Sequence, residues 1–244
     1  QVAEEELGDQ GAALESYQEI LSLQDGNQVA LVELERLHEL RDDWAALAGV
    51  LGEETAIFDE PEELLRVHRK AAEIWMDKLE SPEKALQEWL SVLELEPGDL
   101  EALEWVESWY RESQRWEELS ALLEGKLEGG LDVEGRREVQ RDLGRLFRDE
   151  LGQGERAMAA WQQVLESAPD DVEALRALLE LYLAEGRWGD VTHVAGLLVP
   201  LVERDDANAL RLLSAELHFE KMEDKSAALA LGRSIMGTHS GDTE

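Results

Sequence analysis

Arginine side chains gather in two segments of the sequence, and their guanidinium groups are suited to binding carboxylates. Residues 136–148 hold five arginines. Four of them are spaced by four, four and three residues, so they share one face of a helix. Residues 66–70 lie 72 positions before residues 138–142 and hold three further basic side chains. These residues form a predicted basic strip, whose members are Arg66, Arg69, Lys70, Arg137, Arg141, Arg145 and Arg148.

The basic strip has two readings, and the sequence leaves both open. In the first, its arginines bind acidic groups of a partner peptide. In the second, they pair with acidic residues of the chain itself, as Glu138 would with Arg141 and Asp142 with Arg145 at a spacing of three. Arg111 lies on a helix between the two segments and is a candidate contact of the same kind.

Trp105 is a further candidate for partner binding. Other tryptophans recur every 72 residues, as Trp44, Trp116 and Trp188 do, which is typical of packing residues in a repeat. The positions equivalent to Trp105 hold a glutamate and an alanine, so repeat packing does not require an aromatic side chain there. Exposed tryptophans make strong contacts in protein interfaces. The alternative is that Trp105 packs locally between repeats.

The residues that catalysis or metal binding would need are scarce. The chain has no cysteine, which excludes disulfides, thiolate zinc sites, iron–sulfur clusters and cysteine nucleophiles. Glu35 and His38 form a single Glu-x-x-His pair, whereas carboxylate-bridged di-iron bundles need two. Glycine-rich phosphate loops and the usual hydrolase motifs are missing. We therefore expect a non-catalytic protein without metal or cofactor.

The net charge of −34 restricts the partners of the protein. A chain with 57 acidic and 23 basic residues repels phosphate backbones and anionic membrane surfaces. The longest uncharged apolar stretch, Val194 to Val202, is too short to span a bilayer. We expect neither nucleic acid nor membrane as a partner. The N-terminus lacks both Met and a signal-peptide pattern, which favours a fragment or processed chain. The compartment stays open, with the cytoplasm favoured.

A repeat of 72 residues organises the whole chain. Besides the tryptophans already named, Tyr17, Trp89 and Trp161 recur at this period, as do Pro97 and Pro169. Several independent series at one period indicate repeated structural units. The predicted units are 7–78, 79–150 and 151–222, with a partial fourth at 223–236. They make one solenoid over residues 1–236, followed by a flexible tail at 237–244.

Each unit reads as four amphipathic helices. In the second unit, a helix over residues 83–95 ends at Pro97, and Asp99 is placed to cap the next helix. Further turns are expected at residues 113–115 and at the glycine pair 129–130. Because no useful stretch alternates polar and apolar residues as strands do, the fold class is all-α. Short connections make successive helices antiparallel, and the pairs must stack to bury their apolar stripes.

The helix pairs resemble tetratricopeptide repeats (TPR). That family places a Leu-Gly and an aromatic in its first helix, an alanine and an aromatic in its second, and a proline after it. The matching residues are Leu143, Gly144, Phe147, Ala157, Trp161 and Pro169 in one pair, and Ala72, Trp75, Ala85, Trp89 and Pro97 in the pair before it. The alternate pairs match less well. The resemblance implies a right-handed α-solenoid of antiparallel helix pairs, a TPR-like superhelix whose first helices line a concave groove.

These features predict an interaction scaffold that binds a partner protein or peptide in the groove. The expected contacts are Arg66, Arg69, Trp105, Arg111, Arg141, Arg145 and Arg148. The partner would offer acidic groups to the arginines, or a basic partner would bind the acidic outer faces. An apolar last helix over residues 225–236 adds end-to-end self-association as a further possibility. The alternative function is a regulatory or sensor segment of a larger enzyme or of a secretion or assembly machine.

Overall fold

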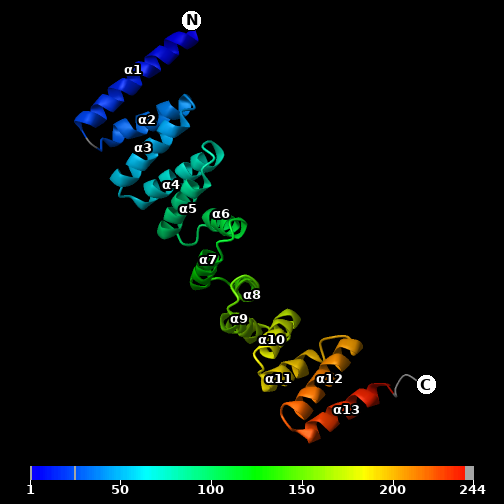
Figure 1. The fold of residues 1–244 in the computed structure, drawn as a ribbon. Coiled ribbons are helices and arrows are strands. Elements are labelled where there is room, and N and C mark those ends of the chain that lie inside the picture. Colours follow the sequence, from blue (N-terminus) through cyan, green and yellow to red (C-terminus); the bar gives the residue numbers. More distant parts are fainter. Residues whose placement is uncertain (1, 25, 240–244) are drawn as a thin grey trace. The chain divides into compact units, whose positions relative to one another are not determined.

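The computed structural model describes residues 2–24 and 26–239, with side chains for residues 10–24 and 26–236. Within these residues the chain forms thirteen α-helices and no strand (Figure 1). The all-α prediction is confirmed. The helices are α1 (Val2–Leu23), α2 (Gln28–Leu40), α3 (Trp44–Ile57), α4 (Pro61–Asp77), α5 (Pro82–Leu95), α6 (Leu100–Glu112), α7 (Trp116–Glu128), α8 (Val133–Asp149), α9 (Gly154–Ser167), α10 (Val172–Ala184), α11 (Trp188–Leu198), α12 (Arg204–Glu220) and α13 (Lys225–His239).

The helices belong to two compact units. The first unit, Gln1–Gln114, contains α1 to α6, and the second, Arg115–Glu244, contains α7 to α13. Within each unit, every helix packs against the next one along the chain. The predicted tail begins later than expected, because α13 continues through residues 237–239. Residues 240–244 of that tail lie outside the described residues.

The helix boundaries repeat with the sequence period. Asn27, Asp99 and Asp171 stand 72 residues apart, and each accepts a hydrogen bond from a backbone N–H of the helix that it caps. The predicted cap at Asp99 is thereby confirmed, since its Oδ1 accepts from Ala102 N at 2.8 Å. The turns repeat as well. Residues 42, 114 and 186 all have a left-handed backbone, with φ of 54°, 57° and 67°. Only the last of these is a glycine, so the turn geometry persists where its residue type changes.

The most extensive helix contacts are those of α4 with α5 and of α8 with α9. Trp89 and Trp161 occupy equivalent places in the two pairs and are 3% and 0% exposed. At equivalent positions the first helices carry small residues, Ala72 and Gly144. A Cβ atom on Gly144 would lie 2.5 Å from Cε2 of Trp161, so the indole ring rests directly on the backbone of α8. Small residues here let the two helices approach closely.

The residues that carry the TPR resemblance lie at these contacts. In the second unit, the side chains of Leu143, Phe147, Ala157 and Trp161 are all buried between helices. In the first unit, Ala72, Ala85 and Trp89 are buried, and Trp75 is partly buried against the cluster of Leu47, Leu51 and Val67. The prediction of TPR-like helix pairs is confirmed at the level of fold.

Candidate partner-binding site

One arginine of the basic strip in each unit binds the cap of the next first helix. Arg69 on α4 pairs with Asp99, which caps α6, and Arg141 on α8 pairs with Asp171, which caps α10. Both aspartates are at least nine-tenths buried. Burial acts to raise the pKa of Asp171, but the Ala174 N–H and Arg141 outweigh it and hold that pKa below its usual value. These two arginines therefore join successive first helices.

Two further strip arginines of α8 form more exposed ion pairs. Arg145 contacts Glu173 on α10 at 2.6 Å and Asp142 on its own helix at 3.1 Å. Arg148 contacts Asp149 at 2.6 Å and Glu180 on α10 at 3.4 Å. The expected pair of Asp142 with Arg145 is thus present, whereas Arg141 pairs with Asp171 and Glu134 rather than with Glu138. Exposed ion pairs of this kind contribute about 0–1 kcal/mol each, so they can exchange partners at little cost.

The strip residues of α4 hold a partly buried charge cluster. Arg66 contacts Glu35 of α2 at 2.9 Å and Glu54 of α3 at 3.2 Å. Lys70 contacts Glu35 at 2.9 Å and Glu39 at 2.6 Å. Glu54 is completely buried, and its Oε1 makes no hydrogen bond within the described residues. The cluster ties α2, α3 and α4 together.

The two buried carboxyls of this cluster have opposite pKa shifts. Burial raises the pKa of Glu54 to about 7, and the neighbouring charge of Glu35 adds to this effect. Burial also acts to raise the pKa of Glu35, but its bond from Lys70 and the charge of Arg66 outweigh burial and lower that pKa. The cluster therefore carries different net charge on the two sides of neutral pH.

Trp105 and Arg111 both lie on α6 and contact side chains of the first unit. Trp105 is half-buried and stacks on Trp109, with ring centroids 5.9 Å apart and planes inclined by 15°. Its ring also lies 6.4 Å from that of Trp89. Arg111 pairs with Glu107 at 2.8 Å. Local packing thus accounts for an aromatic side chain at position 105.

The predicted contacts divide between the two units. Arg66, Arg69, Trp105 and Arg111 belong to the first unit, and Arg141, Arg145 and Arg148 belong to the second. Each of these arginines has an acidic partner in the chain, and partner binding by them stays a prediction. Over the described residues, no group of three or more histidine, aspartate and glutamate side chains is placed to hold a metal. In the same part of the chain, no helix is long and apolar enough to cross a membrane.

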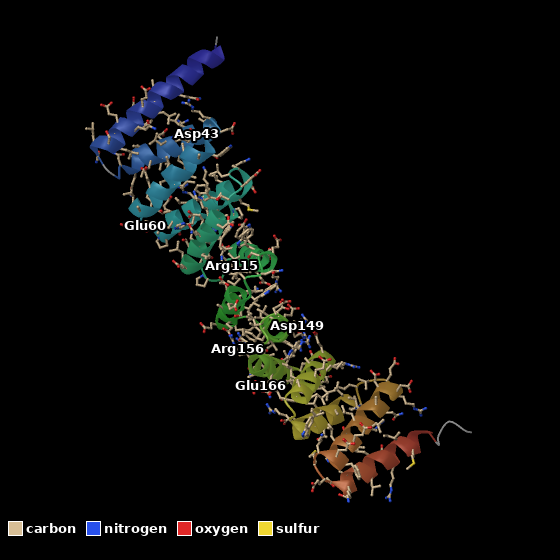
Figure 2. The ribbon with its side chains drawn as sticks, in the orientation of Figure 1. Asp43, Glu60, Arg115, Asp149, Arg156 and Glu166 are labelled. Atoms are coloured by element: carbon tan, nitrogen blue, oxygen red, sulfur yellow. The ribbon has the colours of Figure 1, made fainter. Side chains whose placement is uncertain are left out.

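A second set of polar residues was missed by the sequence analysis. A cavity of about 310 Å³ lies among α7, α8 and α9. Arg156 of α9 is labelled in Figure 2 and lines this cavity with Arg136 and Gln140 of α8. The signal was available in the repeat alignment, because Ala160 at the cavity wall stands where the preceding unit has Glu88. A search for chemistry-bearing residues does not flag an alanine.

Comparisons with known proteins found similarity among solved structures. No protein-family model matches the sequence, and no curated protein matches it. Several solved structures of TPR proteins resemble it. YrrB, a TPR protein with an unusual peptide-binding site, is 17% identical, with 70% of this chain and 84% of that chain covered and a TM-score of 0.43. Pseudomonas aeruginosa PilF is 16% identical, with coverage of 96% and 95% and a TM-score of 0.40. The type IV pilus biogenesis factor PilW is 17% identical, with coverage of 89% and 96% and a TM-score of 0.39.

Proposed function

We propose that the chain is a non-catalytic scaffold that binds a protein or peptide partner across its first helices. The supporting observation is a row of exposed ion pairs that reach from one first helix of the second unit to the next. Arg145 meets Glu173, Arg148 meets Glu180, and Arg176 meets Asp206, over α8, α10 and α12. Such a surface offers guanidinium groups at regular intervals to an extended partner.

The strip arginines differ in how readily they could serve a partner. Arg69 and Arg141 hold buried helix caps, so a partner would have to compete with strong structural bonds. Arg145, with 45% of its side chain exposed, pairs with Glu173, which is 48% exposed. Since both groups are already hydrated, a partner carboxylate can replace Glu173 with little loss. We expect Arg145 and Arg148 to contribute most, with Arg66, Arg69, Trp105, Arg111 and Arg141 as further contacts.

Affinity capture with cross-linking mass spectrometry tests this function. The wild type is compared with an Arg145→Glu, Arg148→Glu variant and with an Arg41→Glu, Arg233→Glu control of the same net charge. Arg41 and Arg233 are exposed and belong to neither α4 nor α8. We expect the strip variant to lose a protein that wild type and control retain, while circular dichroism shows all three folded. Equal capture by all three would contradict binding at the strip, and turnover in a broad substrate panel would contradict the scaffold function.

A further inference from the structure

The cavity of the second unit lies on a different face of α8 from the basic strip. Its α8 residues follow a helical spacing of four, three and four and are Arg136, Gln140, Leu143 and Phe147. The strip residues occupy another stripe of the same helix, about a third of a turn away. Residues of α7 and α9 complete the wall, and they are Glu124, Leu127, Arg156, Ala159, Ala160 and Gln163. The cavity therefore forms a second polar surface of this unit.

The polar groups that face the cavity are incompletely paired. Gln140 is only 7% exposed, and its amide makes no hydrogen bond with any described residue. Arg136 likewise forms no ion pair within the described part of the chain. Arg156 stacks on the ring of Phe147 at 4.0 Å and pairs with Glu124 at 2.7 Å, in an exposed ion pair. The Gln140 amide is not among the buried polar atoms that lack a partner, so it reaches the solvent of the cavity and is free to donate to a group bound there.

The preceding repeat places a carboxylate at the equivalent position. There His68 and Glu88 stand where Gln140 and Ala160 stand in the second unit, and Nδ1 of His68 lies 2.7 Å from Oε2 of Glu88. The framework around them is shared. Nζ of Lys84 lies 3.8 Å from the ring centroid of Trp75, as Arg156 stacks on Phe147. The second unit thus has the stacked cation and a polar residue on α8 but an alanine in place of the carboxylate.

We propose that the cavity receives the side-chain carboxylate of a glutamate or aspartate from a protein partner, in the place that Glu88 takes in the preceding repeat. Arg136, Arg156 and the Gln140 amide supply the donors, against one carboxylate of the wall, Glu124. Guanidinium groups bind carboxylates through paired hydrogen bonds. A water molecule takes about 30 Å³, so a cavity of about 310 Å³ has room for this side chain.

The α12–α13 pair, which is equivalent to α8–α9 one repeat later, supports the assignment of the site to the α8–α9 pair. Its equivalents of Arg136, Gln140 and Arg156 are Asn208, Leu212 and Ala228. Neither cation of the cavity recurs there. Two arginines and an unpaired amide around a cavity with no carboxylate of its own at position 160 are therefore a property of the α8–α9 pair.

The inference rests on the proposed function, because its occupant belongs to a protein partner, but its test needs no partner. The probe is N-acetyl-glutamate N-methylamide, whose side-chain carboxylate is its only charge. The full chain is titrated while NMR follows the Gln140 side-chain amide and the Nε–H groups of Arg136 and Arg156. We expect saturable shifts of these signals, and none with the glutamine analogue of the probe. N-acetyl-alanine, whose only carboxylate is terminal, should bind more weakly.

Variants decide whether the signals report this cavity. Ala160→Glu should place the chain's own carboxylate in the cavity and weaken the probe by about tenfold or more. Arg136→Gln lies at an exposed position and should weaken it without affecting the fold. Arg233→Gln, at an exposed position of α13 outside both the cavity lining and the basic strip, is the matched control and should bind as wild type. Equal shifts with the glutamine analogue, or unchanged binding by Arg136→Gln, would overturn the proposal. Stronger binding of N-acetyl-alanine would overturn the side-chain source. If the probe does not bind in the cavity but the strip still captures a partner, the carboxylate site is wrong and the proposed scaffold function stands.

Discussion

The α4–α5 and α8–α9 pairs share their packing but differ in where they keep acidic groups. Both bury a tryptophan, both carry a small residue at the equivalent position of the first helix, and both join an arginine to the aspartate cap of the next first helix. Around α4, carboxylates are buried inside the fold, at Glu35 and Glu54. Around α8, the Asp171 cap is buried but Glu173 and Glu180 are more exposed, and the cavity beside Gln140 has an alanine where the earlier pair has Glu88. The two pairs therefore share their helix packing. The charged groups around α4 bond to one another inside the first unit, whereas those around α8 lie nearer the surface of the second unit.

The largest expected difference between the pairs comes from Arg66. Arg66→Ala leaves Glu54 and Glu35 with Lys70 as their remaining cation, and unpairing buried charges costs about 3–5 kcal/mol. We expect a loss of this size in the free energy of unfolding at pH 8, measured by urea denaturation. Arg145→Ala, which removes exposed ion pairs, should lose about 0–1 kcal/mol. Equal losses in the free energy of unfolding of the two variants would contradict the difference between the buried and the exposed ion pairs.

The next effect is a pH dependence confined to the first unit. The pKa of Glu54 is raised to about 7 in the folded chain, against 4.5 for an ordinary glutamate. The folded state therefore binds more protons than the unfolded state between these values, and stability falls as pH rises through this window. We expect wild type to lose about 2–3 kcal/mol from pH 5 to pH 8 relative to Glu54→Gln.

The control for this pH effect is the neighbouring glutamate. Glu53 is exposed, so Glu53→Gln should keep the wild-type slope. The lowered pKa of Glu35 acts in the opposite sense, with stability lost as pH falls below its ordinary value. That loss lies at more acidic pH and is common to all three proteins. If the stability of Glu54→Gln changes with pH as that of wild type does, burial does not raise the pKa of Glu54.

Exchange of the small residues tests the shared packing. In Gly144→Ala the new methyl group meets the Trp161 ring, and overpacking of this kind costs about 1–3 kcal/mol. The opposite change, Ala72→Gly, should cost about 1 kcal/mol through the lower helix propensity of glycine. Urea unfolding of both variants measures the two losses. A neutral Gly144→Ala would show that the α8–α9 contact relaxes more easily than the position of Trp161 implies.

The last expected effect concerns the aspartate caps that the two pairs share. Asp99→Ala and Asp171→Ala each remove an N-cap bond and an ion pair to an arginine, for a loss of about 1–2 kcal/mol. Asp→Asn at either position should lose less, because asparagine also caps helices. We expect similar values in both units when unfolding is followed by hydrogen exchange of α6 and α10. A loss in one unit only would show that the two arginine–aspartate pairs are not equivalent.

The sequence predicted those parts of the molecule that depend on apolar residues and turns. Sequence spacing predicted the roles of Trp89, Trp161 and Asp99, because packing and capping need particular residue types at fixed positions. Charged residues were harder to place. With 57 acidic residues available, nothing local distinguishes buried Glu54 from its exposed neighbours, or assigns Asp171 to Arg141 across 30 positions. The wall of the cavity beside Gln140 includes Ala160 where the preceding repeat has Glu88, and composition and motif searches do not register such a replacement.

Photo-cross-linking at two equivalent positions tests most directly whether the cavity beside Gln140 binds a protein partner. Benzoylphenylalanine replaces Gln163, at the cavity of the second unit, or Ser91, its equivalent in the preceding repeat. Both variants are irradiated in lysate, and the attached peptides are sequenced by mass spectrometry. We expect position 163 to capture a protein through a segment containing glutamate or aspartate, and Ala160→Glu to abolish this adduct. Equal capture at position 91, or an adduct at 163 that persists in Ala160→Glu, would contradict this expectation.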